Sequence, residues 1–181
     1  MQTGSASSFI RPEEFWRDVG LRAEQTVAHL GCGAGFYLIP AAMIVGPKGK
    51  VIGVDILPDM LAEADGRARR AGLEKIIRTV RSDLESAGST LPAAFADWVL
   101  VANILHQADP QKMLTEARRI VHSEGAVVVV DWDTLATPLG PPPKQRISRD
   151  RVLEVAATCD LKVKSFFTPS PYHYGILLTP I

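Results

Sequence analysis

The 181-residue sequence has few cysteines and no long apolar run, and each shortage excludes a class of protein. Its two cysteines, Cys32 and Cys159, lie far apart and outside any Cys-x-x-Cys pair, which argues against a disulfide framework or a zinc site. No apolar segment reaches the roughly 18 residues of a membrane span. The N-terminus has no basic-then-apolar signal pattern. We therefore expect a protein of the reducing cytoplasm, with no membrane span and no metal site.

The sequence also has no excess of charge of either sign. Lysine and arginine number 20, aspartate and glutamate number 20, and the sequence pI is about 6.9. Dedicated nucleic-acid binders usually carry a strongly basic domain, so we expect no nucleic-acid partner. The length and the 46% of hydrophobic residues indicate one globular domain. We place this domain at residues 25–181, after an N-terminal arm at residues 1–24 in which Pro12 opens a short helix.

A segment of alternating glycines is the first informative motif. Residues 27–30 predict a buried strand, and an amphipathic run at 36–45 predicts a helix. Between them lie three glycines, Gly31, Gly33 and Gly35. Glycine lets the backbone turn sharply and approach a ligand closely, and a strand, a glycine turn and a helix form a recurring nucleotide site. A dinucleotide fold would need a third glycine at Phe36, and no Gly-Lys-Ser/Thr of a P-loop follows.

A second motif lies at the distance expected for the next strand. The apolar run at residues 51–54 ends in Asp55, twenty positions after Gly35. In nucleotide-binding α/β folds, an acid near this distance accepts hydrogen bonds from ribose hydroxyls. The two motifs together therefore indicate a ligand that carries a ribose.

These motifs resemble motifs I and II of the class I S-adenosylmethionine-dependent methyltransferases. The resemblance covers about residues 24–131 and is closest to the small-molecule and quinone-biosynthesis branch, through segments such as Leu105-His106, Asp109-Pro110 and Val128-Val129-Val130-Asp131. It implies S-adenosylmethionine as the cofactor, S-adenosylhomocysteine as its product, and a small molecule as the methyl acceptor.

The resemblance also implies roles for individual residues. It places Asp55 on the ribose, the glycine turn under the methionine part, and Asp83 on the adenine amino group. The predicted cofactor-binding residues are Gly31, Cys32, Gly33, Gly35, Asp55, Ile56, Asp83, Leu84 and Asn103. His29 departs from the family pattern, because relatives usually carry at this position an acid that helps to hold the ammonium end of the cofactor.

Methyl transfer from a sulfonium needs no nucleophile from the protein, because the cofactor is already activated. A general base is needed only where the acceptor must lose a proton. His106, just after the fourth expected strand, is the first candidate, since imidazole titrates near neutral pH. His173, near the end of the chain, is the second. The alternative roles are a local surface contact for His106 and sheet packing for His173.

The order of the expected elements predicts an α/β fold. Further strands are expected at residues 51–55, 76–80, 95–103, 126–132, 161–168 and 172–179, with helices beginning near residues 58, 109 and 148. With the resemblance, this order implies a Rossmann-like, doubly wound sheet of seven mostly parallel strands with an antiparallel last strand, in a three-layer αβα sandwich. RNA or protein methylation, a catalytically silent cofactor-binding module, a dinucleotide oxidoreductase, and a homodimer that closes the pocket remain open alternatives.

Overall fold

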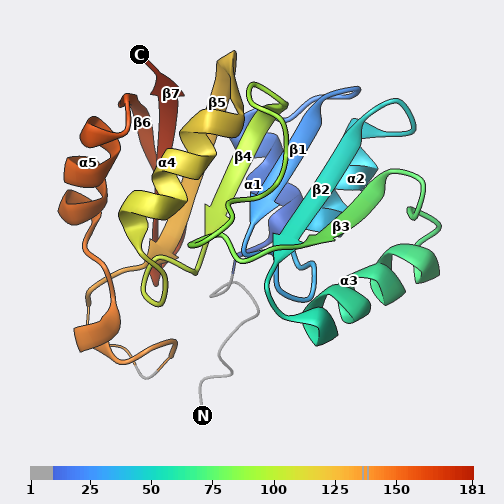
Figure 1. Ribbon diagram of the computed structural model, residues 1–181. Helices are drawn as coiled ribbons and strands as arrows, with labels where there is room; N and C mark the ends of the chain where they lie inside the picture. Colours follow the sequence, from blue (N-terminus) through green and yellow to red (C-terminus); the bar gives the residue numbers. More distant parts are fainter. Residues whose placement is uncertain (1–9, 136, 138) are drawn as a thin grey trace.

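The computed structural model describes residues 10–135, 137 and 139–181, so the first nine residues of the predicted arm lie outside the described residues. One seven-stranded sheet, in the order β3-β2-β1-β4-β5-β7-β6, crosses the molecule (Figure 1). Its strands are β1 (Thr26–Leu30), β2 (Lys50–Asp55), β3 (Ile77–Arg81), β4 (Ala96–Ala102), β5 (Val121–Trp132), β6 (Leu161–Ser170) and β7 (His173–Pro180). The first five strands pair in parallel, and β7 is antiparallel to both of its neighbours. The predicted fold class is confirmed.

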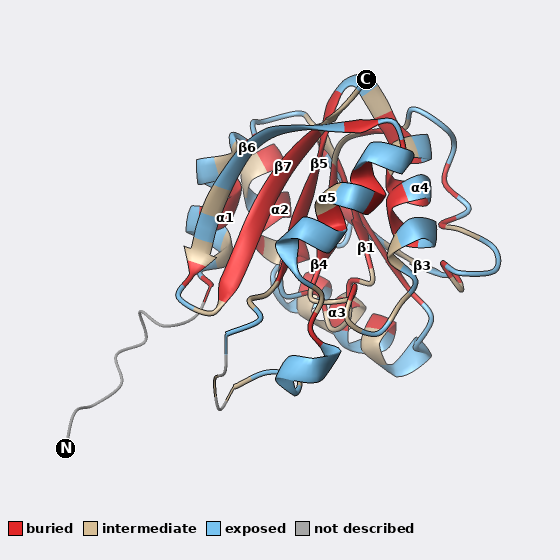
Figure 2. Ribbon diagram, turned by 90° about the vertical axis from the view of Figure 1, so that its left-hand side faces the viewer, coloured by how far each residue is buried: buried red, intermediate tan, exposed pale blue. Residues whose placement is uncertain are grey.

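Helices cover both faces of the sheet and complete the three layers. The helices are α1 (Pro12–Val19), α2 (Leu38–Val45), α3 (Pro58–Arg70), α4 (Pro110–Ile120) and α5 (Arg149–Thr158). The buried residues of α1, α2 and α3 pack in one cluster, and those of α4 and α5 pack in a cluster on the opposite face. Figure 2 shows that the central strands and the inner sides of the helices are buried, while the outer sides of the helices and most of the edge strand β6 are exposed. None of the described helices is long and apolar enough to cross a membrane.

Local sequence explains where α4 and α5 begin. Pro110 occupies the first turn of α4, where a missing N–H costs nothing, and the Asp109 side chain accepts hydrogen bonds from the N–H groups of residues 111 and 112. The Ser148 hydroxyl caps α5 in the same way by accepting from the backbone N–H of Arg151. These two caps confirm the predicted starting points of both helices.

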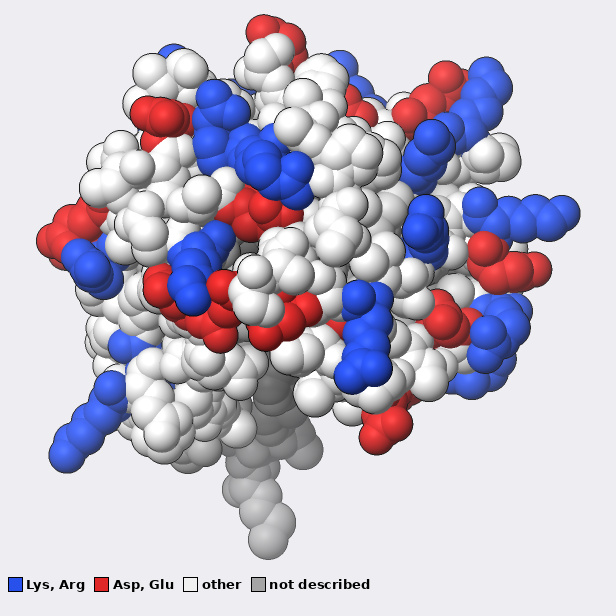
Figure 3. Space-filling model, in the orientation of Figure 1, with Lys and Arg blue, Asp and Glu red and all other residues white. Residues whose placement is uncertain are grey.

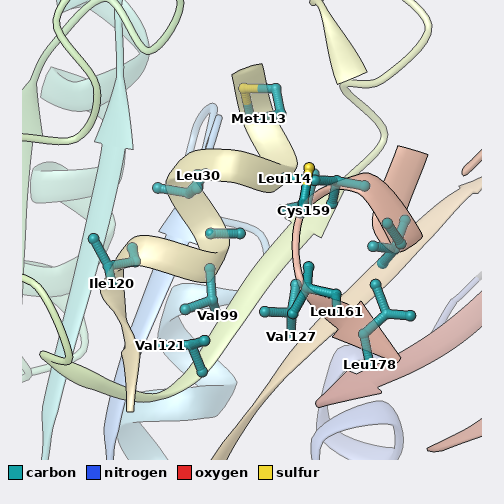
Figure 4. Packing of buried hydrophobic residues seen from close by; sticks show 14 of the residues in the cluster. Leu30, Val99, Met113, Leu114, Ile120, Val121, Val127, Cys159, Leu161 and Leu178 are labelled. Carbon is teal, nitrogen blue, oxygen red and sulfur yellow. The ribbon is translucent and has the colours of Figure 1, made fainter. Parts of the chain in front are cut away.

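The two apolar clusters fix the helices onto the sheet. On the α4 and α5 side, Leu30, Val99 and Val127 of the strands belong to one buried cluster with Leu114 of α4 (Figure 4). On the other side, Trp16 of α1 is fully buried, and its Nε1 donates to the Tyr37 carbonyl oxygen over 2.9 Å. Helix α1 therefore packs directly on the start of α2, within the same core as the sheet.

The predicted boundary between α4 and β5 is wrong by several residues. The strand expected at residues 126–132 begins earlier in the structure, because β5 starts at Val121, which pairs with Ala96. Gly125 is a close-approach position inside the strand, because a Cβ there would lie 2.7 Å from the Asp97 carbonyl oxygen. The run at 36–45 also differs, since α2 begins at residue 38 and is mostly buried rather than amphipathic.

Candidate active site

The carboxyl ends of β1, β2 and β4 meet at the point where the chain changes direction across the sheet. From β1 the chain moves outward through β2 to β3, and it then returns to the other side of β1 with β4. Open α/β sheets bind their ligands at such a switch point. A cavity of about 600 Å³ lies there, lined by residues from the glycine turn, from the ends of β2 and β4, and from the segment after β3.

The glycine turn forms one wall of the cavity and is tied to β2. The backbone N–H groups of Gly31 and Cys32 both donate to the Val54 carbonyl oxygen, over 2.8 and 3.0 Å. Gly31 and Gly33 have left-handed φ angles of +71° and +51°, which favour glycine. A Cβ on Gly31 would collide with the Ile104 side chain, whereas a Cβ on Gly33 would meet no protein atom within 4 Å. The Gly33 backbone therefore faces open space at the wall of the cavity.

Asp55, at the end of β2, is held in place by this turn. Its Oδ2 accepts from the Gly33 backbone N–H over 2.7 Å, and its Oδ1 accepts from the Leu57 N–H over 3.0 Å. Each carboxylate oxygen has two acceptor positions, so each keeps capacity for one further donor. Because Asp55 also lines the cavity, this arrangement suits a ligand with two neighbouring hydroxyl groups.

Beyond Asp55, the cavity has an apolar rim and an acidic turn. Phe36, Ile56 and Leu57 are 50%, 50% and 56% exposed, which provides apolar surface for a flat ring at the cavity opening. Asp83 and Leu84, in the segment after β3, also line the cavity. Hydrogen bonds from the Ser86 side chain and the Glu85 N–H lower the pKa of Asp83. Asp83 thus stabilises its own turn as well as lining the cavity.

Three side chains bring unpaired polar atoms to the cavity. Both ring nitrogens of His29, the Tyr37 hydroxyl and Asn103 Oδ1 are buried without a hydrogen-bond partner among the described residues, and all three residues line the cavity. Asn103 also has a left-handed φ of +55°, which is uncommon for a residue other than glycine. Buried polar groups are nearly always paired, so these atoms indicate a polar ligand.

The Cys32 thiol is an unsuitable nucleophile. Burial, with a smaller contribution from the Asp55 charge, raises its pKa to about 12. Since the thiolate is the reactive form, this side chain serves as a wall of the cavity. Within the described ranges, no group of three or more His, Cys, Asp or Glu side chains is placed to hold a metal ion.

The structure brings most of the predicted cofactor-binding residues together. Eight of the nine line one cavity: Gly31, Cys32, Gly33, Asp55, Ile56, Asp83, Leu84 and Asn103. Gly35 is outside this lining, and a Cβ there would lie 3.0 Å from Cβ of Ala64. Its position therefore allows α3 to pack closely against the turn.

The two predicted catalytic histidines lie outside the cavity lining, near Asp131 at the end of β5. The His106 Nδ1 is 3.5 Å from Asp131 Oδ1, while its neighbours Ile104 and Gln107 do line the cavity. The His173 Nδ1 bonds the Ser170 hydroxyl over 2.8 Å, and its ring stacks on Trp132 at 4.2 Å. Burial lowers the pKa of His173 to about 4.

Sequence reasoning did not single out Tyr37 or Asp131 as site residues. Tyr37 immediately precedes the first residue of α2 and lines the cavity. Its side chain can be placed there only when the direction of α2 is known. Asp131 is fully buried, and it accepts from the backbone N–H groups of Leu105 and Trp132. An acid that directly follows four consecutive valines in β5 was the available signal for Asp131, since such a run is typical of a strand buried on both faces.

Comparisons with known proteins agree with this site. The family described as "Methyltransferase domain" matches residues 21–160. A crystal structure of a SAM-dependent methyltransferase from Aquifex aeolicus superposes with a TM-score of 0.88, at 27% identity, over 99% of this chain and 94% of that one. The chain is 31% identical over 157 residues to a nocamycin O-methyltransferase of Saccharothrix syringae, a match that covers 81% of this chain and 52% of the relative. It is 27% identical over 127 residues to a demethylmenaquinone methyltransferase of Lactobacillus johnsonii, with coverage of 70% and 52%.

The chain spans between 27% and 52% of the length of the curated relatives it matches. The matched region nevertheless contains strands β1 to β5, the glycine turn, Asp55 and Asp83. Fold, cavity and family match thus agree: the chain belongs to the methyltransferase-domain family, with the class I fold of the S-adenosylmethionine-dependent methyltransferases.

Proposed function

We propose that this chain transfers a methyl group from S-adenosylmethionine to a small-molecule acceptor. The observation that carries the proposal is the Asp55 carboxylate, anchored by the glycine turn at the wall of the cavity and left with free acceptor capacity. The family match supports the proposal, and so do the buried polar atoms of the cavity that have no hydrogen-bond partner among the described residues.

The residues of the chain would act mainly by binding and alignment. The cofactor supplies a methyl group activated on a sulfonium sulfur. Asp55 would accept from the two ribose hydroxyls, and Asp83 from the adenine amino group. The apolar rim at Phe36, Ile56 and Leu57 would cover the adenine ring and exclude water. Holding two reactants in line can contribute about 7–11 kcal/mol to lowering a barrier.

His106 is the residue we propose as general base for an acceptor that loses a proton. Asp131 lies 3.5 Å from its Nδ1, and such a carboxylate would orient the imidazole and stabilise it once protonated. His173 stays a candidate for the wall of the acceptor site, because its ring is held by Ser170 and Trp132. We expect His106→Gln to slow methyl incorporation while leaving the affinity for S-adenosylhomocysteine unchanged.

The surface and the thiols support a small acceptor and a reducing compartment. Lysine and arginine side chains are interspersed with aspartate and glutamate on the face that Figure 3 shows, which does not favour nucleic acid as the acceptor. Cys32 and Cys159 are both buried free thiols, as in cytoplasmic proteins. The relatives are named for two different small molecules, nocamycin and demethylmenaquinone. A second copy that closes the cavity remains part of the proposal.

Calorimetry with S-adenosylhomocysteine tests the proposal directly. We expect the unaltered protein to bind it and to give no heat with NAD. Asp55→Asn removes the negative charge but keeps the size of the side chain, and it should weaken binding by about 1.5–3 kcal/mol, the range of a hydrogen bond to a charged group.

Asp59→Asn is the matched control, because Asp59 is an exposed acid in the first turn of α3 and does not line the cavity. Its affinity should equal that of the unaltered protein. An Asp55→Asn protein that binds as tightly as the Asp59→Asn control would show that the ribose lies elsewhere.

A further inference from the structure

His29 and Tyr37 form a pair of buried polar side chains in the cavity wall. Each residue is 3% exposed. Their rings meet edge to face, with centroids 5.5 Å apart and an interplanar angle of 87°. Both ring nitrogens of His29 and the Tyr37 hydroxyl lack a partner in the described part of the chain. The two side chains come from different elements, β1 and the residue before α2, and both line the cavity.

The surrounding residues hold this pair firmly. The Tyr37 carbonyl oxygen accepts from Trp16 Nε1, and the Tyr37 ring packs edge-on against Phe15 and Phe36, with centroids 5.2 and 5.0 Å away. A buried polar group without a partner costs about 1–3 kcal/mol. Leaving both the His29 ring and the Tyr37 hydroxyl unpaired at one cavity therefore costs free energy. Hydrogen bonds to a bound polar ligand would offset this cost.

The pair carries no charge near neutral pH. Burial lowers the pKa of His29 to about 3 and raises the pKa of Tyr37. A neutral imidazole offers one donor and one acceptor, and a phenol offers a donor and an acceptor. The matching ligand group therefore presents both donors and acceptors. An amino-acid zwitterion, with its ammonium and carboxylate, is such a group.

We propose that His29 and Tyr37 form an uncharged subsite that hydrogen-bonds the zwitterionic amino-acid end of S-adenosylmethionine. This inference rests on the proposed function and deepens it. The pair takes the place of the acid that the family resemblance leads one to expect at position 29. Recognition of the amino-acid end by this chain then depends on neutral hydrogen bonds rather than on a carboxylate.

Two ligands separate this subsite from the rest of the cavity. S-adenosylhomocysteine carries the amino-acid end, whereas 5′-methylthioadenosine has the same adenosine thioether without it. In calorimetry, Tyr37→Phe should bind S-adenosylhomocysteine about five- to tenfold more weakly, the equivalent of one neutral hydrogen bond, and His29→Leu should lose at least as much. Both variants should bind 5′-methylthioadenosine within about twofold of the unaltered protein.

Tyr172→Phe is the matched control, because it removes the same hydroxyl from a half-buried tyrosine outside the cavity lining. Its affinity for both ligands should be unchanged. Thermal unfolding without ligand gives a second readout. Tyr37→Phe should keep or raise the melting temperature, since it removes an unpaired buried hydroxyl, whereas a hydroxyl with a structural partner would lower it when lost.

Each result has a separate meaning. An unaltered protein that binds neither ligand contradicts the proposed function itself. One that binds 5′-methylthioadenosine as tightly as S-adenosylhomocysteine overturns the subsite and leaves the proposed function standing. The subsite is also overturned if the variants keep full affinity for S-adenosylhomocysteine, or if they weaken both ligands equally. A lower melting temperature for Tyr37→Phe would likewise assign the hydroxyl to the fold.

Discussion

Two buried imidazoles, those of His29 and His173, affect the stability of the fold. Burial lowers their pKa values to about 3 and about 4. For His173 the nearby Asp131 opposes this shift and Arg146 adds to it. Both side chains are therefore neutral in the folded protein at a pH at which the unfolded chain already takes up protons.

We expect the free energy of unfolding to decrease as the pH is lowered through a defined window. The stability is complete above about pH 6.5, the pKa of an unperturbed histidine, and is lost as the pH drops toward the folded values. The slope should approach about 1.4 kcal/mol per pH unit for each histidine. Urea unfolding at pH 7.5, 6 and 5 measures it. His29→Leu should remove about half of this slope, and a flat profile in the unaltered protein would contradict neutral burial.

Gly33 provides a second prediction for a single residue. Its φ is +51° and an added Cβ meets no protein atom, so Gly33→Ala should cost only about 1–2 kcal/mol of stability. The new methyl group stands at the cavity wall and should weaken S-adenosylhomocysteine binding about tenfold or more. Gly72→Ala is the matched control, with a φ of +69°, open space and a position outside the cavity lining. Equal affinities for the two variants would show that the ligand does not approach Gly33.

Spacing along the chain was enough to predict the glycine turn and Asp55, and the family resemblance added Asp83. Gly31 directly follows β1, Asp55 ends β2 and Asp83 lies two residues after β3, so their positions depend mainly on where each strand ends. It was not enough for Gly35, which serves helix packing, because close packing depends on the path of α3. It also missed Tyr37 and Asp131, whose contacts include residues distant in sequence, such as Trp16 for Tyr37 and Leu105 for Asp131.

Among the elements, α4 and α5 pack against each other and each begins at a side-chain cap. Asp109→Ala and Ser148→Ala should each lower the free energy of unfolding by about 1 kcal/mol. The double variant should lose about the sum if the caps act independently. Chemical denaturation of the three variants measures this. Loss of stability in only one single variant would mean that the other cap is not formed in solution.

Element order was predicted correctly, whereas some boundaries were not. Strong starting signals at Pro58, Pro110 and Ser148 placed α3, α4 and α5 well. The start of β5 was predicted five residues late, at 126 instead of 121. The reason is that a glycine such as Gly125 commonly follows the end of a helix. Its true role, a close contact with the backbone of β4, depends on strand pairing that local sequence does not contain.

For the whole molecule, we expect ligand binding to raise resistance to heat. A ligand that binds only the folded state stabilises it by about 2.7 kcal/mol at one hundred times its dissociation constant. S-adenosylhomocysteine should therefore raise the melting temperature in a concentration-dependent way, while NAD at the same concentrations should not. A comparable rise with NAD would favour a dinucleotide site instead.

The cavity lining comes from one part of the chain. It includes residues from the glycine turn, from β2 and from the segments after β3 and β4, and no described residue beyond Met113 belongs to it. The valine-rich β5, helix α5 and the final hairpin support the same sheet from the other side of the switch point. Substitutions in the segment from β5 to the final hairpin would then change the surroundings of Asp131 and His173 while the residues that recognise the nucleoside stayed the same. The same scaffold could in this way act on a new acceptor and keep its methyl donor.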